Sequence, residues 1–84
     1  MDIYFHKNAF EDYLFFQQTD KKTVERINLL IKAISREPFS GIGKPEALKY
    51  SLSGFWSRRI SNEHRLVYTM RDKTVYILQC RYHY

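Results

Sequence analysis

The feature that most limits the fold of this chain is a change of hydrophobic period on either side of one loop. Before the loop, apolar residues recur at i, i+3 and i+4, which is the spacing of one helix face. This stripe consists of Val24, Ile27, Leu30, Ile31 and Ile34. After the loop, apolar and polar residues alternate, as is typical of strands. The loop, residues 38–45, holds both prolines and two of the three glycines of the 84-residue chain.

One strand and two helices are expected before the end of that loop. A period-2 pattern over residues 2–6 predicts a first strand. Helical spacing from Asn8 predicts a first helix, and Thr19 or Asp20 suits the N-cap of the second. So short a joint should fold the two helices into a hairpin. Pro38 should end the second helix, because the residue before a proline avoids the α region.

Three strands are expected after the loop. Alternation predicts them over residues 48–60, 64–70 and 74–82, with a turn at 72–73 and with Gly54 marking a turn or a bulge. The order β-α-α-β-β-β with short loops predicts an α+β fold. Its sheet should be antiparallel, with about four strands, and should carry the two N-terminal helices on one face.

Length and composition narrow the class of protein. The chain is long enough for one domain, residues 1–84. Cys80 is the only cysteine, so no internal disulfide is available. The N-terminus does not resemble a signal peptide, and no stretch approaches the roughly 18 apolar residues of a membrane span, so we expect a cytoplasmic protein without membrane contact. Metal and nucleotide motifs are lacking, so no metal and no cofactor is expected.

The formal net charge of +5 lies entirely in the second half of the chain. Residues 1–43 hold six Lys or Arg and six Asp or Glu, whereas residues 44–84 hold eight cations against Glu46, Glu63 and Asp72. A basic face suits a polyanion, and nucleic acid is the commonest one in the cytosol. Charge alone leaves open a small basic protein whose charge only keeps it in solution.

This basic half is suited to RNA cleavage, whose chemical demands are modest. The ribose 2′-OH is a nucleophile already held beside the phosphate. The protein must therefore remove its proton, stabilise the charged phosphate and protonate the leaving 5′-oxygen. A carboxylate can take the proton, arginine matches the phosphate oxygens, and histidine is a natural acid near neutral pH. Aromatic residues, 17% of the chain, can stack on exposed bases.

Glu46 and Arg65 are candidate groups inside the basic half. Glu46 lies among cations and is either a general base or a surface acid paired with lysine. Arg65 alternates with apolar residues, which puts it on a sheet face, either to bind a phosphate or as an ordinary strand arginine. Arg58 and Arg59 should point to opposite faces, so that at least one reaches a phosphate unless both pair with acids.

Residues 81–84 are expected to extend the last strand to the end of the chain. Chain ends usually fray, but this one is rich in planar side chains, which favours a function. Alternation places four side chains on one face of that strand: Ile77, Gln79, Arg81 and His83. His83 is the candidate acid, whereas Cys80, His6 and His64 are interpreted as structural or surface groups.

Four stretches together closely resemble the YoeB (Txe) toxins of the RelE/ParE superfamily of bacterial toxin–antitoxin systems. They are GKPEALK at 43–49, LSGFWSRRI at 52–60, EHRLVY at 63–68 and CRYHY at 80–84. The similarity covers essentially the whole chain. It implies a RelE-like fold and a ribosome-dependent endoribonuclease that cuts mRNA in the A site of the 70S ribosome by 2′-OH attack, inhibiting translation.

The resemblance also implies roles and partners. By position in these motifs, Glu46 is similar to the family's general base, His83 to its acid, Arg65 to its phosphate-stabilising arginine and Tyr84 to its substrate-orienting aromatic. Lys49 and Arg59 match further basic positions of the family's RNA-facing surface, and with Arg58 and Arg81, taken from the strand patterns, they are the RNA-binding candidates. The implied partner is a YefM/Phd-type antitoxin, and a homodimer is a further possibility. The alternative function keeps the fold without catalysis, as a gyrase inhibitor or a plain binding module.

Overall fold

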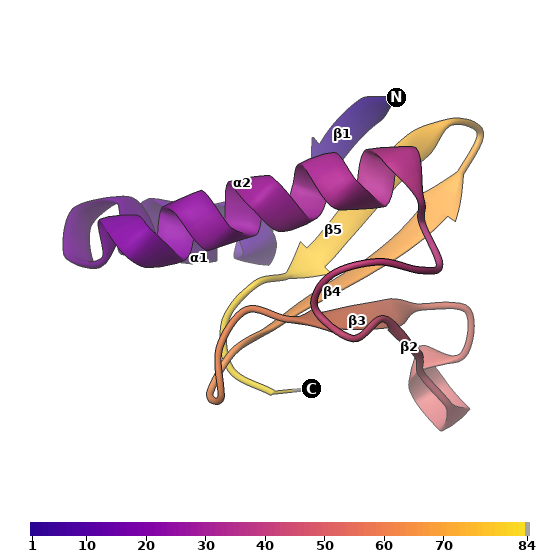
Figure 1. Cartoon of the computed structure of the whole chain (residues 1–84). Helices are drawn as coiled ribbons and strands as arrows, with labels where there is room; N and C mark the ends of the chain where they lie inside the picture. Colours follow the sequence, from indigo (N-terminus) through magenta and orange to yellow (C-terminus); the bar gives the residue numbers. More distant parts are fainter. Residues whose placement is uncertain (84) are drawn as a thin grey trace.

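Two helices cover one face of a five-stranded sheet in the computed structural model, which describes residues 1–83 (Figure 1). In chain order the elements are β1 (Asp2–Phe5), α1 (Lys7–Thr19), α2 (Lys21–Arg36), β2 (Glu46–Ala47), the 3-10 turn η1 (Tyr50–Leu52), β3 (Trp56–Arg59), β4 (Arg65–Arg71) and β5 (Thr74–Gln79). The α+β class and the helices on one face are confirmed.

The two helices form the expected hairpin around Asp20. The backbone N–H of Asp20 donates to the Phe16 carbonyl and closes α1, while its carboxylate accepts from the backbone N–H of Thr23 and caps α2. The Tyr13 hydroxyl donates to the Asn28 side chain at 2.7 Å and ties the helices together. One residue therefore ends one helix and starts the next, which satisfies backbone groups that both helix ends leave unpaired.

The sheet differs from the expected antiparallel sheet of about four strands. Its order is β1-β5-β4-β3-β2, and β1 pairs with β5 in parallel, from Asp2 opposite Thr74 to Phe5 opposite Ile77. The remaining pairs are antiparallel. The direction of β1 depends on a partner far along the chain, and the fifth strand, β2, has only two residues, too few to produce visible alternation.

The single strand expected over residues 48–60 is wrong. That stretch holds η1, a turn and the four-residue β3, while β2 precedes it and pairs with β3. Gly54 has a φ of 94° and lies in the turn, where the Phe55 N–H donates to the Leu52 carbonyl. Positive φ suits glycine, which has no Cβ to clash. The prediction that Gly54 marks a turn is therefore confirmed.

The core lies between the helices and one face of the sheet. Helix residues in this cluster include Phe16, Ile27, Leu30 and Ile34, and sheet residues include Leu66, Tyr68, Val75 and Ile77. The expected stripe of α2 is thus confirmed as core, and each fully buried side chain of this size contributes about 1.5–3 kcal/mol. The opposite face of β4 carries Arg65 and Val67, as alternation predicted.

The end of β5 departs from the predicted strand over residues 74–82. A register shift places Ile77 opposite Tyr68 but Gln79 opposite Val67, so one residue of β5 is extra. Ile77 and Gln79 therefore face opposite sides of the sheet instead of sharing one. β5 ends at Gln79, and the expected row of side chains along one face does not form.

Candidate active site

Strand register gathers polar side chains on the face of the sheet away from the helices. Glu46 of β2 pairs with Ser57 of β3, and Arg59 of β3 pairs with Arg65 of β4. Directly opposed residues project from the same face, and so do residues two apart on a strand. Glu46, Ser57, Arg59 and Arg65 therefore form one continuous row across three strands.

His83 completes this row from the C-terminal segment. A hollow of about 210 Å³ is lined by Lys44, Glu46, Ser57, Arg59, Arg65 and His83. The three candidate groups for general base, phosphate stabilisation and general acid thus line the same hollow, although they are far apart in the sequence. Arg65 and the C-terminal histidine therefore share one surface.

The guanidinium of Arg65 is fixed by the turn that precedes β4. Arg65 is only 8% exposed, and its Nη1 donates to the carbonyls of Ser61 at 2.6 Å and His64 at 3.1 Å. A third carbonyl, that of Asn62, lies at 3.4 Å. Three carbonyl dipoles orient the cation in advance, so binding an anion in the hollow requires little ordering of this side chain.

His83 is held at the edge of the hollow by its ring and by its backbone. Its Nε2 lies 3.2 Å from the Asn62 carbonyl, which can only accept, so that nitrogen carries a proton in this contact. The His83 carbonyl accepts from the Gln79 side-chain amide at 3.2 Å. These two contacts therefore hold the His83 ring at the rim of the hollow, the position in which a general acid is required. Tyr84 lies outside the described residues.

A second hollow of about 520 Å³ adjoins Glu46 on the side of η1. It is lined by Glu46, Ala47, Leu48, Lys49, Tyr50 and Leu52. Lys49 is exposed, and Tyr50 is 92% exposed with a φ of 59°. The sequence did not single out Tyr50, because nothing in its local pattern distinguishes this ring from the other aromatic residues of the chain. Here a cation and an aromatic face flank the candidate base, groups that suit a phosphate and a nucleobase.

Arg58 does not belong to an RNA-facing surface. It is fully buried on the helix side of β3, and its guanidinium donates to the carbonyls of Glu37, Ser40 and Ile42 and to the Tyr68 hydroxyl. These partners occupy it at distances of 2.6–3.1 Å. The expectation that Arg58 and Arg59 face opposite ways is right, but only Arg59 reaches the hollow, and Arg58 organises the loop before β2.

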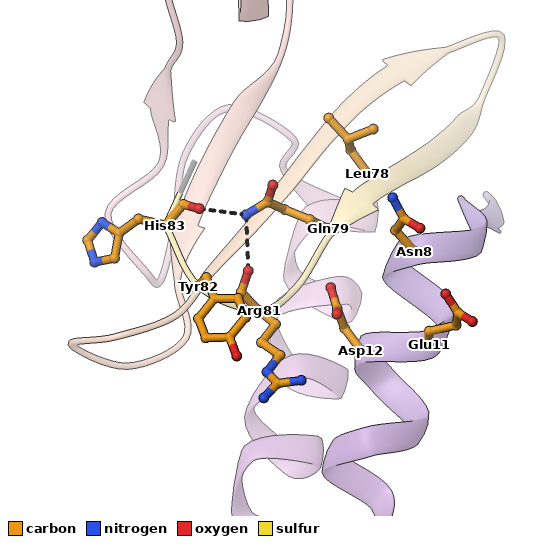
Figure 2. Close-up of a pocket in the computed structure, with 8 residues that line it drawn as sticks. All are labelled: Asn8, Glu11, Asp12, Leu78, Gln79, Arg81, Tyr82 and His83. Carbon is orange, nitrogen blue, oxygen red and sulfur yellow. Dashed lines mark hydrogen bonds between the residues drawn. The ribbon is translucent and has the colours of Figure 1, made fainter.

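Arg81 is also directed away from the hollow that holds Glu46. Its guanidinium carbon lies 3.6 Å from the centre of the Phe15 ring and 4.6 Å from that of Tyr82. Figure 2 shows Arg81 pointing toward α1 while His83 points the opposite way. The two side chains therefore do not form the expected row on one strand face, and Arg81 does not line the hollow that holds Glu46, although both residues border the hollow drawn in Figure 2.

A third hollow, of about 510 Å³, lies between α1 and the end of β5 (Figure 2). Asp12 borders it and accepts from the Cys80 backbone N–H at 3.3 Å. Burial raises the pKa of the Asp12 carboxyl, and that hydrogen bond lowers it in part. Burial raises the pKa of the Cys80 thiol to about 12, so the thiol is neutral near pH 7 and not nucleophilic. Cys80 is a small core residue, as expected.

His64, interpreted from sequence as structural or surface, supports the segment that carries His83. Its Nδ1 accepts from the backbone N–H of Tyr82 at 2.8 Å, and its ring contacts those of Phe16 and Tyr82. No sequence motif marks this role, because it depends on a contact between residues eighteen positions apart. Among residues 1–83, no cluster of three or more His, Cys, Asp or Glu side chains could hold a metal ion, and no helix is long and apolar enough to cross a membrane.

Comparison with known proteins assigns this arrangement to a family. A family model described as the YoeB-like toxin of bacterial type II toxin–antitoxin systems matches residues 5–84. Toxin YoeB of Synechocystis sp. is 63% identical over 84 residues, which cover 100% of this chain and 98% of that protein.

Two solved structures from Staphylococcus aureus have the same fold. The heterotetrameric YoeB–YefM toxin–antitoxin complex contains a chain with 55% identity and a TM-score of 0.93, and the YoeB dimer one with 55% identity and a TM-score of 0.94. Each alignment covers 100% of this chain and 98% of the other. The chain is therefore a member of the YoeB-like toxin family of bacterial type II toxin–antitoxin systems.

Proposed function

We propose that this chain is a ribosome-dependent endoribonuclease that cuts mRNA in the A site of the 70S ribosome and so inhibits translation. The observation that carries the proposal is that Glu46, Arg65 and His83 line one basic hollow. A proton acceptor, an oriented cation and a proton donor are the three groups that 2′-OH attack on a phosphate needs.

In the proposed reaction, Glu46 takes the proton of the ribose 2′-OH while that oxygen attacks the adjacent phosphorus. Arg65, already oriented by three carbonyls, stabilises the charge that builds on the phosphate oxygens. His83 gives a proton to the leaving 5′-oxygen as the P–O bond breaks. The products are a 2′,3′-cyclic phosphate and a 5′-hydroxyl, and Tyr84 is proposed to orient the substrate.

The proposed RNA surface extends from this hollow to the neighbouring one. Lys44 and Arg59 line the first hollow, and Lys49 and Tyr50 line the second, with Glu46 common to both. Cations attract the phosphate backbone and an exposed ring can stack on a base. Arg58 and Arg81 are omitted from this surface because both guanidinium groups are engaged elsewhere.

We also propose that a YefM/Phd-type antitoxin neutralises the protein in the cytoplasm, where translating ribosomes are found. The Staphylococcus aureus toxin assembles with YefM into a heterotetramer and also occurs as a dimer, which supports the antitoxin and a homodimer as partners here. A basic face of this kind suits an acidic segment that folds on binding. A gyrase inhibitor or plain binding module is the alternative, and neither needs an acid–base pair.

Primer extension on a translated mRNA tests the proposed reaction. The parent protein should produce cuts confined to the ribosomal A site. His83→Gln should cut roughly 10²–10⁴ times more slowly, because it removes the proton donor. His6→Gln is the matched control, because His6 caps α1 and does not line the hollow. The His6→Gln protein should cut at the parental rate.

Each outcome of this experiment decides a separate claim. A His83→Gln protein that cuts as fast as the parent would refute the acid assignment while leaving the enzyme in place. A parent protein that binds ribosomes and cuts nothing would refute the enzymatic function in favour of a non-catalytic binder. Both variants should still bind the antitoxin, which checks that they are folded.

A further inference from the structure

The C-terminal segment after β5 is held by side chains in place of a neighbouring strand. Once β5 ends at Gln79, residues 80–83 belong to no strand, yet several of their backbone groups are hydrogen-bonded. The Cys80 N–H donates to Asp12 at 3.3 Å, and the Tyr82 N–H donates to His64 Nδ1 at 2.8 Å. Backbone groups buried without a partner are costly, which applies to the part-buried Cys80 N–H, and the two side chains together hold the path of the segment.

His64 makes the shorter of these two contacts, and this contact selects the tautomer of its ring. A backbone N–H can only donate, so Nδ1 of His64 carries no proton, and the ring proton is on Nε2. The ring is held against Phe16 of α1, with centroids 5.1 Å apart at 68°. The core thus orients an acceptor toward the Tyr82 N–H.

Tyr82 adopts a backbone conformation that needs this support. Its φ is 63°, in the left-handed region that a bulky residue seldom occupies. Both of its backbone groups are engaged, because its carbonyl accepts from the Arg65 backbone N–H at 3.0 Å. Conformations of this kind persist only where the surroundings over-determine them. Residues 64 and 65 therefore hold Tyr82 from both sides, and the bend at Tyr82 directs His83 toward the hollow.

The side chain of Gln79 also holds the bend at Tyr82, through hydrogen bonds to the backbone on both sides of it. Its side-chain amide nitrogen donates to the Arg81 carbonyl at 3.1 Å and to the His83 carbonyl at 3.2 Å (Figure 2). The register shift in β5 turns Gln79 toward this side of the sheet. A single amide therefore bridges two carbonyls two residues apart, which fixes the curvature of the turn that ends at His83.

We propose that His64 and Gln79 are positioning residues that hold His83 in place for proton donation. The inference rests on the proposed ribonuclease function, in which His83 is the acid. Neither residue touches the reacting atoms: His64 acts through the Tyr82 N–H and Gln79 through two carbonyls. Arg65 links the two parts of the site, since its side chain lines the hollow and its backbone N–H holds Tyr82.

Two substitutions at His64 separate positioning from packing. His64→Phe keeps a ring beside Phe16 but removes the acceptor, whereas His64→Asn keeps an acceptor oxygen near the position of Nδ1 and removes the ring. On ribosomes, His64→Phe should lower kcat by roughly ten- to a hundred-fold with little change in KM, the effect of a misplaced catalytic group. His64→Asn should restore most of that kcat although it packs less well.

Gln79→Glu gives an independent test with nearly the same shape. A carboxylate cannot donate to the carbonyls of Arg81 and His83, so kcat should again fall while KM changes little. His6→Phe is the matched control, because His6 Nδ1 also accepts a backbone N–H, that of Asn8 at 3.3 Å, but at the start of α1. It should leave kcat at the parental value.

Amide hydrogen exchange of Tyr82, measured by NMR, tests the hydrogen bond between the Tyr82 N–H and His64 without any RNA cleavage. Exchange at Tyr82 should be slow in the parent and in His64→Asn and fast in His64→Phe, while the amides of β4 stay protected. Parental kcat in both His64→Phe and Gln79→Glu would overturn the proposal, as would a His64→Asn protein as slow as His64→Phe. If the parent cuts no RNA, the proposed ribonuclease function is refuted. Slow Tyr82 exchange would then support only the structural claim that His64 holds the Tyr82 backbone.

Discussion

Arg58 and Arg59 are neighbours in β3 and meet opposite environments. Arg58 is fully buried and its guanidinium holds three carbonyls of the loop before β2, whereas Arg59 is exposed and lines the hollow with Glu46. Gly43 lets this loop pass close by, since a Cβ there would lie 3.1 Å from the Arg58 Cβ. Because successive side chains of a strand face opposite ways, Arg58 stabilises the fold and Arg59 lines the candidate site.

Substituting the two arginines should therefore separate stability from activity. Arg58→Ala leaves three part-buried carbonyls and the buried Tyr68 hydroxyl without their donor, so we expect a loss of about 3 kcal/mol in the free energy of unfolding. Arg59→Ala should change that free energy by less than about 0.5 kcal/mol, as exposed substitutions usually do, and should slow RNA cleavage. Urea denaturation measures the first effect, and equal losses from the two variants would contradict the assignment.

At the scale of elements, the two helices are coupled through a titrating cap. Asp20 caps α2, and hydrogen bonds from the Thr23 hydroxyl and backbone N–H lower the pKa of its carboxyl below the ordinary value of 3.8. The folded protein therefore binds this proton less tightly than the unfolded chain does. The stability that the cap provides is present above pH 3.8 and is lost as the pH falls through that value toward the lower folded pKa.

Two cap variants test this pH dependence. Asp20→Ala removes the cap and should lower the melting temperature at pH 7, with a difference from the parent that shrinks as the pH falls below 3.8. Asp20→Asn keeps a capping oxygen that does not titrate, so it should melt near the parent at pH 7 and lose less stability in acid. Thermal melts followed by circular dichroism between pH 7 and pH 3 provide the measurement. A constant difference between Asp20→Ala and the parent would contradict the cap's titration.

The elements differ in how far their sequence determines them. The stripe from Val24 to Ile34 identifies α2 because helix burial repeats within the element itself. The end of β5 does not follow from alternation, because the extra residue that separates Ile77 from Gln79 depends on pairing with β4. In the same way, the burial of Arg58 depends on carbonyls that a distant loop supplies. Local pattern thus predicts helices and strand positions, and tertiary pairing decides strand ends and which cations remain at the surface.

At the scale of the whole molecule, the charge is less concentrated at the hollow than the sequence suggests. All of the excess of +5 lies in residues 44–84, but Arg58 is buried, Arg65 is 8% exposed and Arg81 stacks on Phe15. Lys44, Lys49 and Arg59 are therefore the exposed cations that a polyanion near Glu46 would meet, in addition to the largely buried Arg65 that lines the hollow. Counterion release makes RNA affinity depend on how many of these charges bind phosphates.

The salt dependence of RNA binding should show which of these cations contact the RNA phosphates. For a short single-stranded RNA, replacing both Lys44 and Lys49 with Ala should reduce the slope of log affinity against log salt by roughly 0.7 for each phosphate that the variant no longer neutralises. Replacing Lys21 and Lys22, at the start of α2, removes the same charge and should leave the slope unchanged. Fluorescence anisotropy from low to physiological salt measures both. Equal reductions would mean that overall charge, and not the surface beside Glu46, attracts the RNA.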